Sequence, residues 1–174
     1  VTDMMYRYPT GILQGQLNLL DSHDVNRFLS YCRGDIRRFR LAEVFLFTSP
    51  GAPSVFYGDE LGMDGNSEFT LRGPMPWNTP RHDERAFFKR LTALRRDNKA
   101  LATGSFRAVY ADEKGLMVYR RALPGQRITV ALNGRNDTVS VAAHVPSDTP
   151  ALSDSFANGS LGAFGYAVFV EKAL

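Results

Sequence analysis

The sequence is poor in cysteine and has no long apolar run. Cys32 is the only cysteine, which excludes an internal disulfide bond and favours a reducing compartment. No apolar stretch reaches the length of a transmembrane helix, and no signal peptide is recognisable. We therefore expect a cytoplasmic protein without a membrane partner. The chain opens with Val1 rather than methionine, so we expect its natural N-terminus to be missing.

The sequence also lacks a strong charge excess and several motifs that carry chemistry. Its 21 Lys and Arg residues against 18 Asp and Glu residues give a net charge of +3, less than a nucleic-acid-binding surface usually needs. A G-x-S-x-G motif and a phosphate-binding glycine pattern are both missing. His23, His82 and His144 are too far apart in sequence to indicate a metal site. We expect no nucleic-acid partner, metal or cofactor in this chain.

Up to about residue 100, apolar runs alternate with amphipathic stretches of helical length. The predicted elements are short buried strands over residues 15–20 and 54–58, helices over 35–48 and 83–98, and a loop rich in Gly and Pro over 59–81. Asp35 is placed to cap the first helix. Strands and helices that alternate with short connections are typical of parallel β/α units.

After Gly104 the apolar period becomes two, which is typical of strands exposed on one face. Strands are predicted over residues 105–111, 115–121, 127–133, 137–145, 151–157 and 164–172. Gly115 is available for the positive-φ position of the first hairpin. We therefore predict two domains, an α/β part over residues 1–99 and an antiparallel β-sandwich over residues 100–174.

Two parallel β/α units cannot shield their own sheet, because a parallel sheet needs cover on both faces and neighbours at its edges. Residues 1–99 are therefore expected to belong to a larger sheet. The missing cover would come from the remainder of that sheet, or from self-association through the exposed parallel strands.

Polar residues follow both predicted strands of the α/β part. The first strand ends in Asp21-Ser22-His23-Asp24 and the second in Tyr57-Gly58-Asp59-Glu60. In β/α folds such positions line active sites, where a carboxylate can act as an acid, a base or a nucleophile, or can stabilise positive charge. A structural alternative stays open, in which Asp24 caps the turn that starts at Val25 and Asp59 orients a loop.

Four stretches of the chain resemble the α-amylase superfamily of glycoside hydrolases, and more narrowly its cyclomaltodextrinase, neopullulanase and maltogenic amylase group. They are "LLDSHDVNRF", "TSPGAPSVFYGDELGM", "RGPMPW" and "LTALRRDNKALATGSF". The resemblance implies the last two β/α units of a (β/α)8 TIM barrel over residues 15–99. An antiparallel β-sandwich C-terminal domain would follow.

The resemblance implies retaining hydrolysis of α-1,4-glucosidic bonds in maltooligosaccharides or other α-glucans. Asp24 matches the carboxylate that stabilises the transition state, His23 matches its sugar-binding partner, and Arg72 matches a substrate-binding residue near the donor-side subsites. The family's nucleophile and acid/base lie on earlier strands, so we expect this chain to be inactive alone. Any calcium requirement would lie in the missing part and stays open.

The chain also departs from the pattern of the group. Glu68, Phe69 and Gly73 stand where the group has aspartate, proline and arginine. Arg27 is expected to steady the loop, and Trp77 either stacks on a sugar ring or is buried. Two alternatives to an enzyme part remain: a non-catalytic carbohydrate-binding module, and an assembly module that completes a barrel with another chain.

Overall fold

The structure, a computed structural model, describes residues 7–78 and 82–172. The helices are α2 (Thr10–Gln14), α3 (Phe28–Tyr31), α4 (Ile36–Thr48), the 3-10 turn η1 (Asp59–Leu61), α5 (Glu68–Leu71), α6 (His82–Asp97) and α7 (Lys99–Thr103). The strands are β1 (Leu17–Leu19), β2 (Ala52–Ser54), β3 (Ser105–Ala111), β4 (Leu116–Leu123), β5 (Gln126–Asn133), β6 (Val139–Ser140), β7 (Leu152–Ala157) and β8 (Ser160–Glu171).

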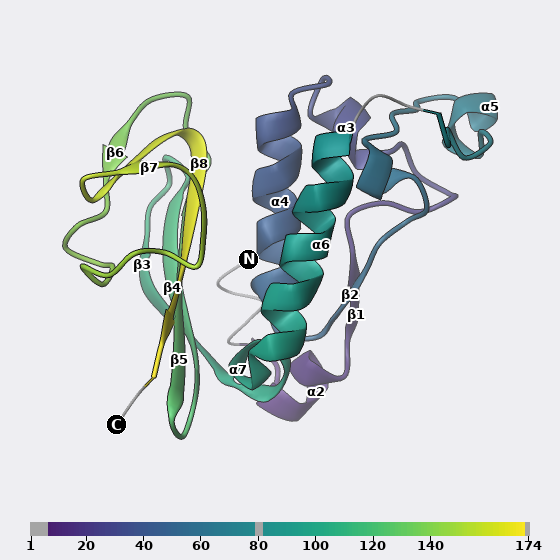
Figure 1. The fold of residues 1–174 in the computed structure, drawn as a ribbon. Coiled ribbons are helices and arrows are strands. Elements are labelled where there is room, and N and C mark those ends of the chain that lie inside the picture. The colour runs from purple at the N-terminus through teal and green to yellow at the C-terminus, as the bar shows by residue number, and fades with distance from the viewer. Residues whose placement is uncertain (1–6, 79–81, 173–174) are drawn as a thin grey trace.

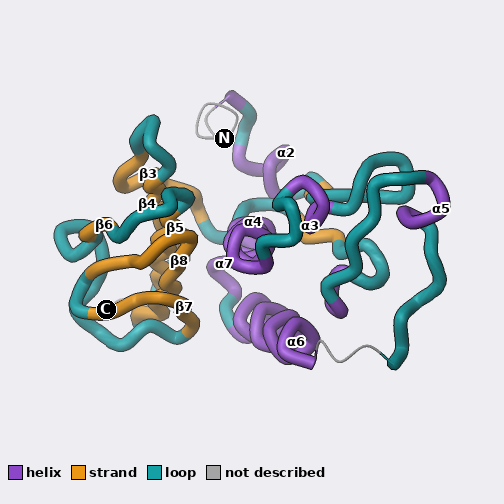
Figure 2. The backbone as a smooth tube through the Cα atoms, turned by 90° about the horizontal axis from the view of Figure 1, so that it is seen from above, coloured by secondary structure: helices purple, strands orange, loops and turns teal. Residues whose placement is uncertain are grey.

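These elements form three layers. The long helices α4 and α6 lie side by side between the antiparallel sheet and the two parallel strands β1 and β2 (Figure 1). The view from above shows the same order, with the loops around α5 at the far side from the sheet (Figure 2). The helices therefore separate the β part of the chain from the loops that follow β1 and β2.

Strands β1 and β2 pair in parallel, with Leu17 opposite Ala52 and Leu19 opposite Ser54. The first strand was predicted over 15–20 and is shorter, whereas the prediction of a second strand over 54–58 is wrong in position. Gly51, at φ 94°, turns the chain directly after α4, and the N–H of Ala52 then donates to Gln16 O at 2.8 Å.

The expectation that these strands are buried is also wrong for β1. Leu17 and Leu19 are 66% and 49% exposed, so the outer face of this small sheet is open to solvent. The exposed leucines agree with the physical argument that two β/α units cannot cover their own sheet.

The long helices form where the sequence predicts them. The N–H of Arg37 donates to the Asp35 carboxylate at 3.0 Å, which caps α4. Helix α6 begins and ends one residue earlier than predicted. Phe87 and Leu91 on α6 are fully buried, together with Phe39 on α4. The apolar faces of the two helices therefore pack into one core.

Two arginines bind the free carbonyl groups at the C-terminal end of α4. Arg95 Nη1 of α6 donates to Phe47 O at 2.7 Å, and Arg121 Nη1 of β4 donates to Thr48 O at 2.8 Å. Positive charge is favourable at this end of a helix, because the last carbonyls have no partner within it. Arg121 is fully buried, and burial lowers its pKa to about 10. Arg121 also donates to Gly104 O at 3.0 Å and so ties the sheet to the helices.

The antiparallel sheet has the strand order β3-β4-β5-β8-β6, and β7 pairs with the other side of β8. The predictions for β3, β4, β5 and β7 are confirmed to within two residues at each end, and Gly115 has the predicted positive φ, at 103°. The strand predicted over 137–145 is wrong beyond Ser140. The chain turns there, and the N–H of His144 donates to Val141 O at 2.9 Å.

The antiparallel sheet is curled, and apolar side chains are buried on both of its faces. Ile128, Val130 and Leu132 of β5 lie in the core that the sheet shares with the helices, as their alternation predicts. Ala131 of β5 and Phe169 of β8 lie in a second core inside the curl. Since both faces are covered, β5 is almost continuously buried.

Candidate functional site

The loop after β1 and the turn after α5 bring the three predicted site residues together. His23 Nε2 lies 3.3 Å from Asp24 Oδ1, and Arg72 Nη2 lies 3.8 Å from the same oxygen. Arg72 Nε also donates to the backbone oxygen of His23 at 3.3 Å. The Asp24 side chain is 68% exposed, so this carboxylate, flanked by an imidazole and a guanidinium, is open to a ligand.

The local backbone N–H groups that Asp24 could have capped are bound by other residues. Ser22 Oγ accepts from the N–H of Asp24 at 3.2 Å, and Ser22 O accepts from the N–H of Val25 at 3.5 Å. Asp21 is buried, and its Oδ2 accepts from the N–H of Phe28 at 2.6 Å, at the first residue of α3. Ser22 and Asp21 thus satisfy the local backbone, which leaves the carboxylate of Asp24 directed to its side-chain neighbours.

Arg27 steadies the loop after β1 by binding the loop after β2, as predicted. Its side chain is fully buried, and Nη1 donates to Tyr57 O at 2.8 Å and to Asp59 Oδ1 at 3.2 Å. The guanidinium carbon lies 4.5 Å from the Phe56 ring centroid and 4.9 Å from that of Tyr57. Arg27 Nε and Nη2 are buried and have no hydrogen-bond partner among the described residues. The cation–π contacts compensate in part for the cost of burying these two atoms.

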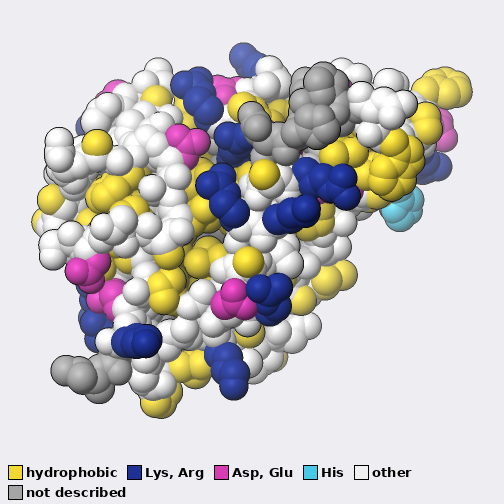
Figure 3. Space-filling view, viewed as in Figure 1, with side chains coloured by type: hydrophobic (Ala, Val, Ile, Leu, Met, Phe, Trp, Pro, Cys, Tyr) yellow, Lys and Arg dark blue, Asp and Glu magenta, His cyan; other side chains and the backbone are white. Residues whose placement is uncertain are grey.

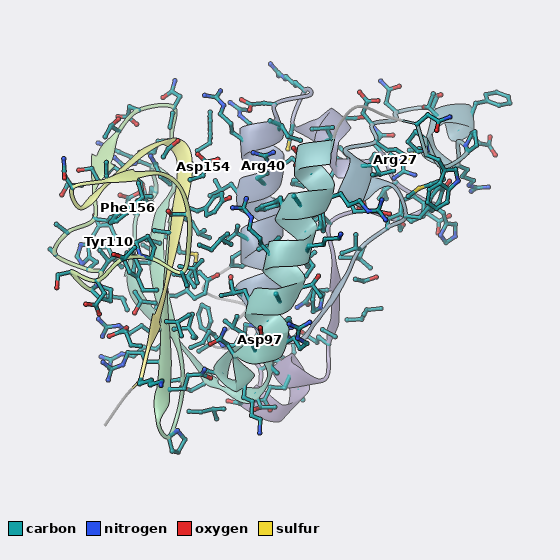
Figure 4. All side chains as sticks on the ribbon, viewed as in Figure 1. Arg27, Arg40, Asp97, Tyr110, Asp154 and Phe156 are labelled. Atoms are coloured by element: carbon teal, nitrogen blue, oxygen red, sulfur yellow. The ribbon has the colours of Figure 1, made fainter. Side chains whose placement is uncertain are left out.

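The N–H of Arg27 donates to Gly65 O at 2.9 Å, and the N–H of Gly65 donates to Ser30 Oγ at 2.9 Å. Figure 4 shows Arg27 on the side of α6 that faces away from the antiparallel sheet. The loops after β1 and β2 and the stretch before α5 are therefore joined at one buried cation.

Three acids lie buried close to one another, and one of them, Asp21, is on the loop that carries Asp24. Asp21, Glu43 and Asp59 are at most 3% exposed. Burial, with a smaller contribution from the charge of Asp21, raises the pKa of Glu43 to about 8. Burial also raises the pKa of Asp59 to about 9, and Asp21 adds to the increase while Arg27 opposes it. Sequence reasoning missed Glu43, although a single acid within the apolar half of α4 was the available signal.

The turn that carries Arg72 is held by its own side chains. Ser67 and Thr70 form a capping box on α5, and Thr70 Oγ1 accepts from the N–H of Ser67 at 3.0 Å. Tyr57 Oη donates to Gly73 O at 2.8 Å and so links this turn to the loop after β2. Arg72 is therefore positioned by a defined turn next to Asp24.

Large aromatic side chains are exposed on the same segment. Phe69 is 91% exposed and Trp77 is 76% exposed, so a buried role for Trp77 is excluded in this structure. The space-filling view shows hydrophobic side chains gathered over the end of the molecule that carries α5, with a histidine at their edge (Figure 3). An apolar patch beside a few convergent polar groups is the usual composition of a ligand site.

Other features of the structure lie away from this site. Within residues 7–78 and 82–172, no group of three metal-ligating side chains comes together, and no helix has the length and apolar character needed to cross a membrane. A cavity of about 570 Å³ lies on the antiparallel sheet between residues 142–150 and 156–159. It is lined by Phe156, Asp148 and Asn158 among others. The helices α4 and α6 lie between the antiparallel sheet and the strand β1 that leads to Asp24 (Figure 1).

Comparison with known proteins places these observations in a family. Residues 2–105 match the family described as "Alpha amylase, catalytic domain", which is more than half of the chain. The chain belongs to the α-amylase family. It is 39% identical over 142 residues to neopullulanase 2 of Thermoactinomyces vulgaris, covering 80% of this chain and 24% of that relative. It is 36% identical over 135 residues to a cyclomaltodextrinase of Thermoanaerobacter pseudethanolicus, covering 76% and 23% of the two chains.

Solved structures of the α-amylase fold agree with this assignment. The ligand-free cyclic α-maltosyl-(1→6)-maltose hydrolase of Arthrobacter globiformis superposes with a TM-score of 0.81 at 31% identity, covering 99% of this chain and 38% of that one. The expected fold class is confirmed: two β/α units of an α-amylase barrel precede an antiparallel β-sandwich. The chain spans about a quarter of the length of the curated relatives it matches.

Proposed function

We propose that this chain supplies the last β/α units and the C-terminal β domain of a glycoside hydrolase that cleaves α-1,4-glucosidic bonds of maltooligosaccharides. Residues 1–99 would form the barrel part and residues 100–174 the β domain. The observation that carries the proposal is the cluster of His23, Asp24 and Arg72 at the C-terminal end of β1. The single buried cysteine supports a cytoplasmic location for the enzyme.

Each residue of the cluster has a role that its chemistry supports. The Asp24 carboxylate would bind hydroxyl groups of the reacting glucose and stabilise the positive charge that develops on it, because glycoside hydrolysis passes through an oxocarbenium-like state. His23 would donate a hydrogen bond to the same ring. Arg72 would hold the carboxylate in place and contact the neighbouring sugar, since its guanidinium lies 3.8 Å from Asp24 Oδ1.

The chain by itself would not turn over substrate. Retaining hydrolysis needs a nucleophile and an acid/base about 5 Å apart on either side of the scissile bond. The three buried acids nearest to Asp24 in the fold do not suit these roles. Asp21 and Glu43 are buried, and Asp59 is buried and bound to Arg27. The reacting pair would come from the part of the barrel that precedes this segment in the relatives.

A chimera tests the assignment. In neopullulanase 2 of T. vulgaris, the aligned part of this chain would replace the segment that it matches, and release of reducing sugar from maltohexaose would be measured. Asp24→Asn in the chimera should lower kcat by about 10²- to 10³-fold, the usual effect of removing one transition-state-stabilising group. Asp97→Asn is the matched control, because that carboxylate is 59% exposed on α6 and lies far from the site (Figure 4).

The isolated chain provides the second arm of the same experiment. We expect it to release no sugar from maltohexaose. Release by the isolated chain that disappears on Asp24→Asn would mean that the reacting pair lies within these 174 residues, and the proposed roles would be wrong.

The cavity on the antiparallel sheet favours a second candidate function, a non-catalytic carbohydrate-binding module. An aromatic ring, a carboxylate and an amide line it, in Phe156, Asp148 and Asn158. In this case maltohexaose binding, followed by calorimetry, would be lost on Asp148→Ala and unchanged on Asp24→Asn. The proposed function expects the reverse.

A further inference from the structure

Phe69 is exposed on a turn that side-chain hydrogen bonds hold together. The side chain is 91% exposed, although burying a phenylalanine is strongly favourable in a folded protein. It lies on α5 between Ser67 and Thr70, whose hydroxyl groups are 2.8 Å apart and belong to the capping box of the same turn. The N–H of Asn66 also donates to Thr70 Oγ1, at 3.1 Å. The exposure of the ring is therefore fixed by the backbone.

The turn places this ring beside the polar cluster. Phe69 lies on α5, and Arg72 is the residue that ends the same turn, three positions later. Arg72 in turn contacts Asp24 and the backbone of His23. The hydrogen bond from Tyr57 Oη to Gly73 O at 2.8 Å holds the turn against the loop after β2. A ligand that binds Asp24 and extends past Arg72 would therefore reach the turn on which the Phe69 ring is exposed.

We propose that Phe69 is a specificity-determining residue that stacks on a third glucose ring of an α-glucan whose reacting ring is bound at Asp24 and whose second ring is bound at Arg72. The inference rests on the proposed function and adds a preference for chain length. The apolar C–H face of a pyranose suits an aromatic ring, whereas its hydroxyl groups suit the neighbouring Arg72. A glucan of several units would contact both the polar cluster and the ring, while maltose bound at Asp24 and Arg72 would not reach Phe69.

The chain carries its own reporter for this binding event. Trp77 is the only tryptophan of the sequence and is 76% exposed on the same loop segment. Its fluorescence can be followed while the 174-residue chain is titrated with maltohexaose and, separately, with maltose. Calorimetry gives a second readout that does not depend on Trp77. Since Phe69 is on the surface, its substitution leaves the core packing unchanged.

Four variants separate loss of ring stacking from loss of any exposed apolar side chain and from loss of the Asp24 carboxylate. Phe69→Ala should raise the Kd for maltohexaose about two- to tenfold and leave the Kd for maltose unchanged. Phe69→Tyr keeps the ring and should bind both sugars like the unmodified chain. Ile12→Ala is the control for loss of an exposed apolar side chain, because Ile12 is 54% exposed on α2, at the opposite end of the molecule from α5 (Figure 1). Asp24→Asn should weaken the binding of both sugars.

The outcomes distinguish a failure of the role proposed for Phe69 from a failure of the proposed function at Asp24. If Asp24→Asn weakens binding while Phe69→Ala leaves the ratio of the two Kd values unchanged, the inference is overturned and the proposed function stands. If the unmodified chain fails to bind maltohexaose in calorimetry, or Asp24→Asn has no effect on binding, the proposed site is wrong and the inference fails with it. If Phe69→Ala raises the Kd for maltohexaose relative to that for maltose, and Phe69→Tyr behaves like the unmodified chain, the result supports both the inference and the proposed function.

Discussion

Glu43→Gln should stabilise the chain strongly at pH 8 and by less than about 1 kcal/mol at pH 5. Glu43 lies on α4 with its side chain 1% exposed, and its Oε2 atom has no hydrogen-bond partner among the described residues. Burial and the nearby charge of Asp21 raise its pKa to about 8, so the carboxyl is protonated in the folded chain at neutral pH. Glutamine has the same shape and is neutral at every pH.

The magnitude follows from the difference in proton affinity between the folded and unfolded chains. Above pH 4.5, the ordinary value, the unfolded chain releases the Glu43 proton while the folded chain keeps it. The free energy of unfolding therefore decreases with rising pH, by about 1.4 kcal/mol per pH unit, until the folded carboxyl also ionises near pH 8. An isolated group would lose about 5 kcal/mol over this window. Because Asp59 titrates in the same buried network, we expect a gain of about 2–5 kcal/mol for the variant at pH 8.

Urea unfolding at pH 5, 6.5 and 8 would measure this effect. Glu84→Gln is the matched control, because Glu84 is also buried but its Oε2 accepts from Arg40 Nε at 3.0 Å. Loss of that ion pair should destabilise the chain by about 3 kcal/mol at neutral pH, since it leaves a partly buried cation without its partner. A stability difference between Glu43→Gln and the unmodified chain that is the same at pH 5 and pH 8 would refute the reasoning, because the carboxyl would then titrate normally.

Three further predictions concern the parts of the fold that hold the site. Arg121→Met should lower the free energy of unfolding, measured in urea, by about 3 kcal/mol, because the carbonyls of Thr48 and Gly104 lose a buried donor. A loss below about 0.5 kcal/mol would contradict this role. Gly51→Ala should lower it by about 2 kcal/mol, because φ is 94° and the new Cβ would lie 2.6 Å from Asn18 Nδ2; a variant with an unchanged thermal midpoint would count against the tight turn. Cys32 is buried with its pKa raised to about 11, so a thiol reagent at pH 8 should label it only as fast as the chain opens, and rapid labelling would show an accessible thiolate.

Helix periodicity and strand alternation were sufficient to predict much of the fold. Asp35 at the start of α4 and the alternation of Ile128, Val130 and Leu132 are local signals, and the structure confirms both. The position of β2 could not be predicted from residues 54–58 alone. Its pairing depends on β1, more than thirty residues earlier, and on the turn at Gly51. The register of parallel strands is thus a property of the tertiary structure.

The candidate site was predictable only in part. Arg72 and His23 are 49 residues apart in sequence, and no spacing rule joins them; the family resemblance suggested the pair, and the structure brings them together. The burial of Arg27 and Glu43 was not predicted, because charged residues are rarely fully buried and a single sequence gives no sign of their exceptions. The exposure of Phe69 is the opposite case, an apolar residue that the turn keeps at the surface.

Strand β8 has a consequence for how the chain is made. Its side chains alternate between the two cores: Tyr166 and Val168 pack towards the helices, while Ala167 and Phe169 pack inside the curl. Because β8 follows every other strand in sequence, neither core can close during translation until these residues have left the ribosome. Until then the edge of β5 that pairs with β8 stays open, and an open strand edge can pair with another chain.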